Sequence, residues 1–451
     1  MMLFYHSIGL QALENKYLYI QTYGCQMNVH DSEQITALMR QFGYERTDNP
    51  RRADLIIVNT CSIREKAAQK AISQIGRFRE LKRKRPDLII GVGGCLAQQW
   101  GQSMLRKAPH LNLVFGTHNI DRLPGLVAYI TETGSRVVET AFQESIGSLD
   151  IHALPEKGNP SAYVTIMQGC NNFCSYCVVP SVRGREVSRN SKDILTEIRT
   201  LADHGVKEVI LLGQNVNCYG KTLSEECDFA ALVTQIGGIA GIERIRFTTS
   251  HPKDLSGELI RCFRQVDPLC EHIHLPVQSG SNSVLREMNR GYSREAYLEK
   301  VMSLRSACPE ISITSDVIVG FPGESDKDFQ ETIDLMEKIR FDNLYSFMYS
   351  EREGTAALKL DQKVSACVKR ERLQCLQALQ EQHTLEKNRD LEGRIQDVLV
   401  EGRSRNCRSD VTGRTRSNKI VNFEGGIELT GSIVPVRITD AYLHSLRGNL
   451  N

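Results

Sequence analysis

The sequence predicts an α/β protein with an N-terminal parallel-sheet domain, a central partial (βα)6 barrel and a small C-terminal β-barrel. Two observations predict this fold. Apolar, β-branched runs alternate with longer stretches of helical pattern through most of the chain, which is typical of parallel sheets covered by helices. The last residues, about sixty of them, instead hold short β-rich runs separated by glycine-containing turns. We expect the three domains to span residues 16–133, 156–385 and 388–451.

The composition is that of an ordinary globular protein. Among 451 residues, 41% are hydrophobic and 24% are charged, and the net charge is +2. No segment approaches the ~20 consecutive apolar residues of a membrane span, and the N-terminus lacks the basic and apolar regions of a signal peptide. We therefore expect a cytoplasmic protein without a membrane partner. In that reducing compartment the fourteen cysteines are more suited to metal or redox chemistry than to disulfides.

The N-terminal domain repeats one unit, an apolar strand that ends at a cysteine and leads into a polar helix. The three units begin with residues 17–25, 54–61 and 87–95, and their cysteines are Cys25, Cys61 and Cys95. Because the carboxyl ends of parallel strands share one edge of a sheet, we expect these cysteines to converge. A single free cysteine is more often a buried small hydrophobic residue, but three at equivalent places favour a ligand set. Residues 134–160 are expected to form a linker.

Six strands are expected in the central barrel, with helical stretches between them, at residues 163–168, 208–213, 244–249, 272–277, 311–319 and 343–348. In parallel barrels the functional residues lie at the carboxyl ends of the strands. The first strand leads directly into Cys170, Cys174 and Cys177, which have the spacing C-x3-C-x2-C. A [4Fe-4S] cluster normally takes four cysteine thiolates, so three from one loop predict a cluster with one iron open to another ligand.

The C-terminal part begins with a long charged helix, expected at residues 362–391, in which Cys367 and Cys375 are interpreted as core residues. The small barrel follows, with strands expected at residues 395–400, 419–423 and 432–438. One stretch of it is basic, through Arg403, Arg405, Arg408, Arg414, Arg416 and Lys419, and Phe423 and Tyr442 are candidate stacking faces. Basic barrels with aromatic residues suit RNA, although a merely solvated charged face remains an equal alternative.

The motif Cys170-x-x-x-Cys174-x-x-Cys177 resembles the signature of radical S-adenosylmethionine (SAM) enzymes. Together with the three upstream cysteines and both barrels, it makes the chain resemble the radical SAM methylthiotransferase family, whose C-terminal module is called TRAM. The resemblance covers about residues 16–447, including runs at 213–217, 274–280, 316–324 and 411–424. One departure is the run 349–355, which lacks a proline that is usual in the family.

The resemblance implies a tRNA enzyme that adds a 2-methylthio group to N6-isopentenyladenosine next to the anticodon. It implies two [4Fe-4S] clusters. Cys170, Cys174 and Cys177 would hold the one that binds and cleaves SAM, and Cys25, Cys61 and Cys95 would hold an auxiliary cluster that carries the sulfur. The implied partners are a tRNA carrying isopentenyladenosine and a flavodoxin- or ferredoxin-type electron donor. A monomer is the default expectation.

Other positions carry weaker signals. Gln214 and Gln278 end the second and fourth barrel strands, from which they could bind SAM, but a hydrogen bond that only organises the loop explains them as well. The Gly320–Gly323 run could approach the adenine or form a plain turn. Arg183 and Arg185 could contact tRNA or form surface ion pairs. No metal is assigned to the other cysteines, which are Cys218, Cys227, Cys262, Cys270, Cys308, Cys367, Cys375 and Cys407.

Three alternative functions remain open from the sequence. Sister methylthiotransferases act on threonylcarbamoyladenosine in tRNA or on an aspartate of a ribosomal protein. A non-catalytic iron–sulfur protein that binds RNA is the third alternative, and it predicts four ligands for each cluster. The sequence instead offers two sets of three cysteines.

Overall fold

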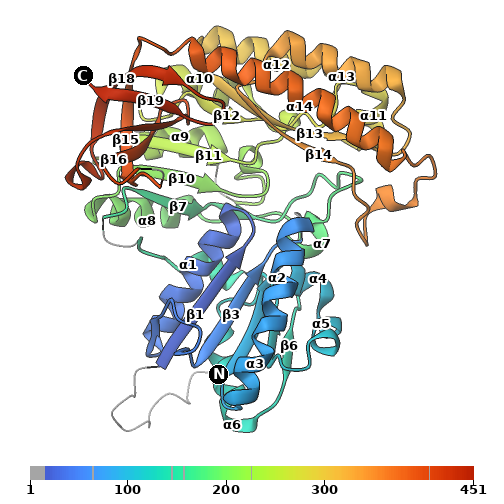
Figure 1. Ribbon diagram of the computed structural model, residues 1–451, viewed down its shortest axis with the longest axis vertical. Helices are drawn as coiled ribbons and strands as arrows, with labels where there is room; N and C mark the ends of the chain where they lie inside the picture. Colours follow the sequence, from blue (N-terminus) through green and yellow to red (C-terminus); the bar gives the residue numbers. More distant parts are fainter. Residues whose placement is uncertain (1–15, 63–64, 144–145, 156–157, 225, 406) are drawn as a thin grey trace. The chain divides into compact units, whose positions relative to one another are not determined.

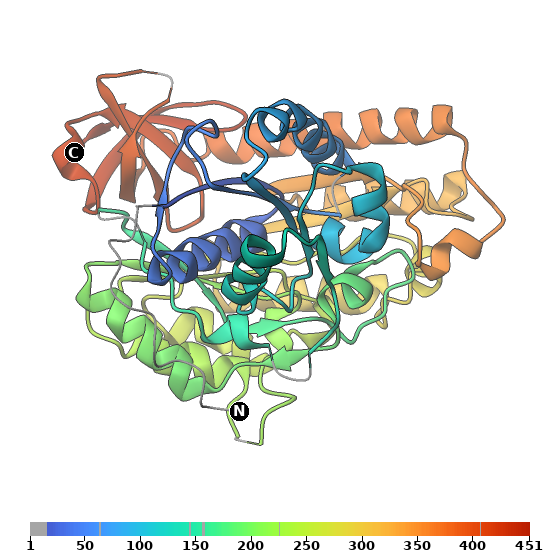
Figure 2. The ribbon, with the colours of Figure 1, turned by 90° about the horizontal axis from the view of Figure 1, so that it is seen from below.

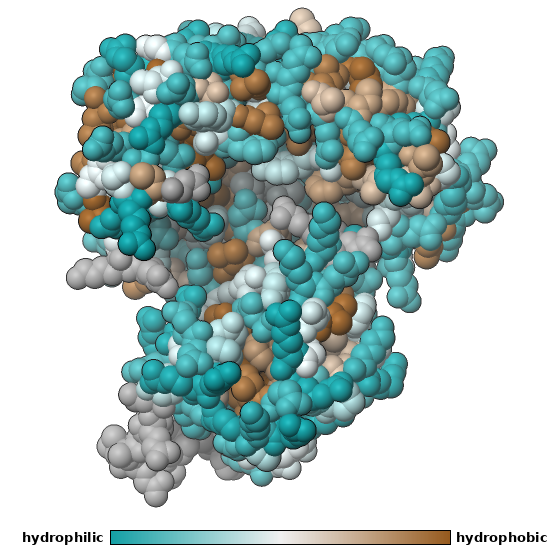
Figure 3. Space-filling model, viewed as in Figure 1, coloured by the Kyte–Doolittle hydropathy of each residue, from teal (hydrophilic) through white to brown (hydrophobic). Residues whose placement is uncertain are grey.

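The computed structural model describes residues 16–62, 65–143, 146–155, 158–224, 226–405 and 407–451 (Figure 1). The chain divides between Ala153 and Leu154 into two compact units. Among the described residues, no helix is both long enough and apolar enough to cross a membrane. On the face drawn in Figure 3, hydrophilic residues predominate and hydrophobic residues lie in small scattered groups.

The first unit is built on one parallel sheet in the order β2-β1-β3-β4-β5-β6. The strands are β1 (Lys16–Tyr23), β2 (Tyr44–Arg46), β3 (Leu55–Thr60), β4 (Ile89–Gly94), β5 (Leu113–Phe115) and β6 (Val137–Glu139). The short strand β6 lies inside the expected linker 134–160, so that expectation was wrong there. Three residues are too few to show an alternating or β-rich pattern in the sequence.

Helices cover both faces of this sheet, as Figure 2 shows. They are α1 (Gln26–Gln41), α2 (Glu65–Arg77), α3 (Arg79–Lys84), α4 (Cys95–Trp100), α5 (Gln102–Lys107) and α6 (Leu123–Thr133). The central strand β3 is buried on both sides: Ile56 and Val58 pack with residues of α2, α4 and α5, while Leu55 and Ile57 pack with residues of α1 and α6. This explains why the strand is apolar at four consecutive positions, Leu55 to Val58, instead of at alternate ones.

The second unit contains the partial barrel, and all six predicted strands are present. They form two parallel three-stranded sheets, β11-β10-β7 and β12-β13-β14, joined by a bridge between Ile245 and Leu269. The strands are β7 (Ser161–Thr165), β10 (Glu208–Leu212), β11 (Arg244–Thr248), β12 (His272–His274), β13 (Ser312–Val319) and β14 (Asn343–Met348).

Helices lie between and around these strands. They are α7 (Val179–Arg183), α8 (Ser191–Asp203), α9 (Phe229–Gly237), α10 (Gly257–Gln265), α11 (Asn282–Glu287), α12 (Arg294–Ala307), α13 (Asp326–Ile339) and α14 (Ala366–Arg389). The alternation along β13 separates two faces: Ile313 and Val317 join the core with residues of α12 and α13, whereas Thr314 and Asp316 are partly exposed on the opposite, inner face. The inner face is thus the polar side of the barrel wall.

Helix α14 corrects one expectation. Cys367 and Cys375 are exposed, not core residues. The buried stripe of α14 instead includes Arg372, Leu376 and Gln380, at intervals of four residues. Leu376, Leu373 and Leu379 of the apolar pattern do pack against the core, so the prediction was wrong for the two cysteines, whose places on the buried stripe are taken by polar residues.

The C-terminal residues form a closed barrel in the order β15-β16-β17-β19-β18. Its strands are β15 (Ile395–Arg403), β16 (Asp410–Thr415), β17 (Ile420–Glu424), β18 (Ile433–Ala441) and β19 (Leu446–Leu450). Phe423 is completely buried in the barrel core, so the expectation of a stacking face there was wrong. Tyr442 is 55% exposed and keeps that possibility.

Arginines fasten this small barrel to the central one. Arg244 donates to the carbonyl oxygens of Arg414 (2.6 Å) and Asp397 (2.8 Å). Arg246, on the same strand, donates to the carbonyl oxygens of Thr415 and Arg416 and pairs with the buried Glu208. The two barrels are therefore joined through hydrogen bonds from two buried arginine side chains to the backbone of β15, of the end of β16 and of the residue that follows it.

Some of the basic residues that were expected to bind RNA instead form ion pairs within the protein. Arg416 forms a two-pronged ion pair with Glu271, Lys419 lies 3.8 Å from Asp342, and Arg414 pairs with Glu401. Arg403, Arg405 and Arg408 remain exposed. The basic stretch thus divides into an attached part and an exposed part.

Candidate active site

The loop of Cys170, Cys174 and Cys177 is closed at its base by two short antiparallel strands, β8 (Met167–Gln168) and β9 (Val187–Ser188). Inside the loop, the backbone N–H of Asn172 donates to the Cys170 sulfur and that of Val179 to the Cys177 sulfur, both at 3.5 Å. The backbone therefore presents hydrogen-bond donors to sulfur. Such donors stabilise sulfur in its negatively charged form.

Gly169 is the residue that allows this loop to close. Its φ angle is +83°, and a Cβ at this position would lie 2.0 Å from the carbonyl oxygen of Arg185. The N–H of Cys170 donates to the carbonyl oxygen of Gly184 at 3.2 Å, so both ends of the loop meet here. Only glycine combines this backbone angle with such a close approach.

Burial favours the protonated form of two of the loop thiols. It raises the pKa of Cys170, and it raises the pKa of Cys177 to about 12, with a further contribution from the neighbouring thiols. A metal ion or cluster at this loop would displace these protons, because thiolate is the ligand form of cysteine.

The other three cysteines lie at the carboxyl ends of three adjacent strands. Tyr23 is paired with Thr60, and Thr60 with Gly94, so the ends of β1, β3 and β4 are level. Cys25 follows two residues after β1, while Cys61 and Cys95 follow directly after β3 and β4. The structure thus places this set at one sheet edge, as the repeated strand pattern predicted.

A buried asparagine pair holds this edge together. Asn28 accepts from the N–H of Cys25 (3.3 Å) and donates to Asn59 (3.2 Å). Asn59 donates back to the carbonyl oxygen of Asn28 (2.9 Å) and to the hydroxyl of Ser32 (3.0 Å). The start of α1 and the end of β3 are therefore linked directly behind the cysteines, a role that the sequence analysis did not find.

Gly94 has the same function at this edge as Gly169 has in the loop. Its φ angle is +88°, and a Cβ there would lie 2.4 Å from the carbonyl oxygen of Thr60. Gly94 also immediately precedes a cysteine, Cys95, which is the first residue of α4. In both sets, a glycine with positive φ directs the chain into a cysteine.

The donor sets suit iron–sulfur clusters. Within the described parts of the chain, no three His, Cys, Asp or Glu side chains are grouped so as to hold a metal ion as they stand. Each set nevertheless brings three sulfur donors to one loop or one sheet edge, and thiolates are the usual ligands of [4Fe-4S] clusters. Three donors to a set leave one iron for another ligand, so the residues fit the clusters that the sequence predicted.

Buried polar atoms mark the carboxyl end of the central barrel. Six side chains there each have one atom with no hydrogen-bond partner in the described part of the protein: Gln168 Nε2, Gln214 Nε2, Asn215 Oδ1, Ser250 Oγ, His251 Nε2 and Gln278 Oε1. Each unsatisfied buried group costs on the order of 1–3 kcal/mol. Their concentration after successive strands is typical of a site that binds a polar ligand.

The two glutamines predicted to bind SAM lie in this group. Gln214 Oε1 accepts the N–H of Gly169 at 2.5 Å, so this side chain also holds the cysteine loop in place. Gln278 has a φ angle of +73°, and its N–H donates to the carbonyl oxygen of Asp316. Asn215, Ser250 and His251 were missed in the sequence analysis, although each follows a barrel strand.

His251 is held in its neutral form. Burial, with a further contribution from the positive charge of Arg290, lowers its pKa to about 2. Its Nδ1 accepts from the N–H of Lys253, and its ring packs edge-on against Tyr292 with centroids 5.7 Å apart. The site therefore contains a neutral imidazole whose second nitrogen is available to a ligand.

The inner face of the barrel offers aromatic and polar groups. His274 Nε2 lies 3.4 Å from Asp316 Oδ1, and His274 Nδ1 lies 3.0 Å from the Thr314 hydroxyl. Tyr345 packs edge-on against His274 at 5.9 Å and is 50% exposed, and Phe347 on the same strand is 42% exposed. A planar ring could stack on these residues and exchange hydrogen bonds with the His–Asp pair.

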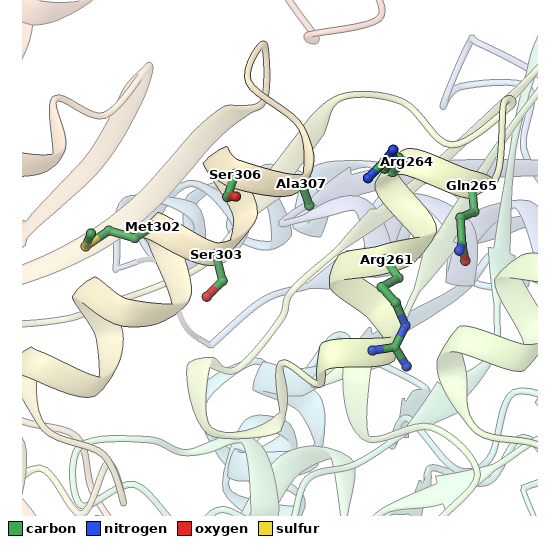
Figure 4. Close-up of a pocket in the computed structure, with 7 residues that line it drawn as sticks. All are labelled: Arg261, Arg264, Gln265, Met302, Ser303, Ser306 and Ala307. Carbon is green, nitrogen blue, oxygen red and sulfur yellow. The ribbon is translucent and has the colours of Figure 1, made fainter.

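A surface pocket of about 590 Å³ lies elsewhere (Figure 4). Its lining residues come from the C-terminal halves of α10 and α12: Arg261, Arg264, Gln265, Met302, Ser303, Ser306 and Ala307. In βα units the helices run antiparallel to the strands, so these helix ends lie at the opposite end of the barrel from the cysteine loop. None of the predicted site residues lines this pocket. We therefore assign the active site to the carboxyl end of the barrel, where the cysteine loop and the unpaired polar atoms lie.

Comparisons with known proteins agree with this division of the chain. Residues 17–116 match the Uncharacterized protein family UPF0004, residues 164–336 match the Radical SAM superfamily, and residues 389–450 match the TRAM domain. Among solved structures, a radical SAM methyltransferase, TsrM from Kitasatospora setae, has a TM-score of 0.59 at 12% identity and covers 76% of this chain and 74% of its own. This similarity concerns the fold alone.

Close relatives match nearly the whole chain. The tRNA-2-methylthio-N(6)-dimethylallyladenosine synthase of Syntrophus aciditrophicus (strain SB) is 64% identical over 442 residues, covering 98% of this chain and 96% of the relative. The synthase of the same name from Geobacter sulfurreducens is 53% identical over 441 residues, covering 97% and 98%. On this identity, and on the Radical SAM and TRAM matches, the chain belongs to the radical SAM methylthiotransferase family of tRNA-2-methylthio-N(6)-dimethylallyladenosine synthases.

Proposed function

We propose that this enzyme adds a methylthio group to C2 of N6-isopentenyladenosine next to the anticodon of tRNA. The observation that carries the proposal is the presence of two separate sets of three cysteines, one in the loop after β8 and one at the ends of β1, β3 and β4. One set suits the cleavage of SAM, and the other suits storage of the sulfur. The name of the close relatives supports the same substrate for this chain.

The loop cysteines Cys170, Cys174 and Cys177 would hold the first [4Fe-4S] cluster. Such a cluster, when bound, supplies the electron that breaks the sulfonium bond of SAM. The protein's part is to bind and orient. Gln214 holds the loop through its bond to Gly169. The unpaired Gln214 Nε2 and Gln278 Oε1 atoms would form hydrogen bonds with the methionine or ribose groups of SAM.

The strand-end cysteines Cys25, Cys61 and Cys95 would hold the auxiliary [4Fe-4S] cluster, which supplies a binding place for the transferred sulfur. The Asn28–Asn59 pair ties the start of α1, which follows Cys25, to the end of β3, which precedes Cys61.

The inner face of the barrel would receive the adenine base. Tyr345 and Phe347 offer exposed aromatic faces, and His274 with Asp316 offers a donor and an acceptor. Unstacked RNA bases are commonly bound by stacking on aromatic side chains and by hydrogen bonds to their edges. This arrangement suits an adenosine that leaves the anticodon loop to react.

The small barrel would bind the tRNA through Arg403, Arg405, Arg408 and Tyr442, which are exposed. Arg414, Arg416 and Lys419 are engaged in ion pairs within the protein and contribute less. We further propose a monomer that works in the cytoplasm, where its tRNA is found, and that takes electrons from a flavodoxin- or ferredoxin-type donor.

The direct test is mass spectrometry of nucleosides from isopentenylated tRNA after anaerobic incubation with the reconstituted enzyme, SAM and a reductant. The proposal predicts 2-methylthio-N6-isopentenyladenosine. Product on threonylcarbamoyladenosine or on a ribosomal protein aspartate, tested in parallel, would favour a sister activity. Absence of product from every substrate, with intact clusters, would favour a non-catalytic RNA-binding protein.

A further inference from the structure

A buried arginine contacts the cysteine loop from outside the three-cysteine motif. Arg290 lies between α11 and α12 and is 4% exposed. Its Nη1 atom donates to the sulfur of Cys174 at 3.3 Å. Among the bonds described for the loop, the two backbone N–H contacts reach Cys170 and Cys177, and this side-chain contact reaches Cys174.

The arginine is fixed from several sides. Nη2 donates to the carbonyl oxygen of Pro276 at 2.8 Å, and Nε donates to the hydroxyl of Tyr292 at 3.0 Å. Nη1 also lies 3.3 Å from the hydroxyl of Tyr176, a residue of the cysteine loop. A guanidinium held by these partners cannot turn away from the sulfur without breaking several buried bonds.

The surrounding segment is also attached to the loop. The N–H of Ser175 donates to the carbonyl oxygen of Met288, the Ser175 hydroxyl donates to that of Glu287, and the Asn289 side chain donates to that of Phe173 at 3.1 Å. Residues 287–290 therefore form a support for the cysteine loop, and Arg290 is the charged member of this support.

No acidic side chain is among the described hydrogen-bond partners of Arg290, whose bonds go to a sulfur, two phenol oxygens and a carbonyl oxygen. An arginine side chain remains positively charged at any accessible pH. Its charge is thus directed at the thiol of Cys174 and is not neutralised by a carboxylate among those partners. Cation charge and hydrogen bonds to ligand sulfurs both favour the more negative, reduced state of an iron–sulfur cluster.

We propose that Arg290 is a positioning residue that raises the reduction potential of the cluster bound by Cys170, Cys174 and Cys177. In the reduction, the cluster gains one electron and a low-potential one-electron donor loses one. Arg290 forms no bond to the substrate; it stabilises the added negative charge through the Cys174 sulfur. This inference rests on the proposed function, because it requires a cluster on these three cysteines.

The test is an anaerobic redox titration of the full-length protein, followed by the electron paramagnetic resonance signal of the reduced cluster. The parent carries Cys25→Ala, Cys61→Ala and Cys95→Ala, so that only the first cluster titrates. Arg290→Met should shift the reduction equilibrium at least tenfold toward the oxidised form, which is a potential lower by about 59 mV for one electron. Arg290→Lys keeps the charge with fewer bonds and should give a smaller shift in the same direction.

Arg294→Met is the matched control. Arg294 belongs to the same region and donates to the carbonyl oxygens of Gly280 and Glu331, but its described bonds do not include a cysteine. Its potential should equal that of the parent. An unchanged or higher potential in Arg290→Met, or an equal shift in Arg294→Met, would overturn the inference.

The outcomes separate this inference from the proposed function. A parent that binds no reducible cluster would contradict the assignment of Cys170, Cys174 and Cys177, and with it the proposed function. If the Arg290→Met variant loses its cluster, the reduction potential of Arg290→Lys becomes the test. A potential below the parent's would support the inference, and a potential equal to the parent's would show that the arginine only supports the fold.

Discussion

The two sets of cysteines reach their sites by different physical routes. Cys170, Cys174 and Cys177 lie within eight residues of sequence, and one loop with backbone N–H donors arranges them. Cys25, Cys61 and Cys95 follow three different strands and lie at one sheet edge only because the sheet aligns β1, β3 and β4. The first set therefore depends on local conformation, whereas the second depends on the tertiary structure of the sheet.

The comparison also shows a shared device. Gly169 and Gly94 each precede a cysteine, each has a positive φ angle, and each leaves no room for a Cβ against a backbone carbonyl. In the loop and at the sheet edge alike, a glycine makes a sharp turn of the backbone directly before a cysteine.

The largest expected effect separates the roles of the two sets. The triple variant Cys170→Ala, Cys174→Ala, Cys177→Ala should lose all SAM cleavage, because the loop then offers no sulfur ligand. The triple variant Cys25→Ala, Cys61→Ala, Cys95→Ala should still cleave SAM but form no methylthio product. The measurement is chromatography of 5'-deoxyadenosine together with mass spectrometry of tRNA nucleosides. Cleavage by the first variant would show that the loop is misassigned.

Single glycine substitutions should damage one set at a time. Gly169→Ala forces an alanine into a positive φ, at a cost of about 1–2 kcal/mol, and adds a clash with the Arg185 carbonyl oxygen. We expect it to reduce the content of the first cluster about tenfold or more and to spare the auxiliary cluster. Gly94→Ala should have the opposite selectivity.

Iron analysis and electron paramagnetic resonance of the two glycine variants measure this selectivity. Gly134→Ala is the control: this glycine also has a positive φ angle, but no atom lies within 4 Å of an added Cβ. Loss of both clusters in either cysteine-adjacent variant would mean that the two sets are not independent.

The asparagine pair offers a smaller effect confined to the sheet. Asn59→Ala removes the donor to the Asn28 carbonyl oxygen and to Ser32, and leaves buried polar groups unsatisfied at a cost of about 1–3 kcal/mol. We expect several-fold weaker retention of the auxiliary cluster against an iron chelator, with SAM cleavage unchanged. The chelation rate, followed by absorbance, is the measurement. Equal sensitivity of the first cluster would argue against the assigned division.

The smallest effect is expected at exposed cysteines. Cys367→Ser and Cys375→Ser should leave iron content and SAM cleavage at the wild-type level, because both side chains lie on the solvent face of α14. Iron lost from either variant would show that the ligand sets are incompletely assigned.

The sequence could predict what depends on local pattern. The six barrel strands, the parallel N-terminal sheet and the placement of Cys25, Cys61 and Cys95 at one sheet edge followed from β-branched runs and their repeated ends. The contacts of Arg290 with Cys174 could not be predicted, because the two residues are 116 positions apart. The ion pair between Arg416 and Glu271 could not be predicted either, because these residues are also far apart in sequence. Arg416 was therefore expected to contact RNA.

Burial was predicted less well than strand position. Phe423 follows the alternation of β17 and faces the barrel core, a choice of face that depends on strand register. The polar stripe of α14 and the unpaired atoms of Ser250 and His251 likewise depend on how elements pack. These properties depend on tertiary structure and cannot be predicted from composition and periodicity.

The most direct test of two separate clusters is the iron content of the reconstituted wild-type protein and of the two triple cysteine variants. Two [4Fe-4S] clusters predict about eight iron atoms per wild-type chain and about four in each variant. About eight irons in either variant, or a loss of nearly all iron from one of them while it remains folded, would contradict the assignment of one cluster to each set.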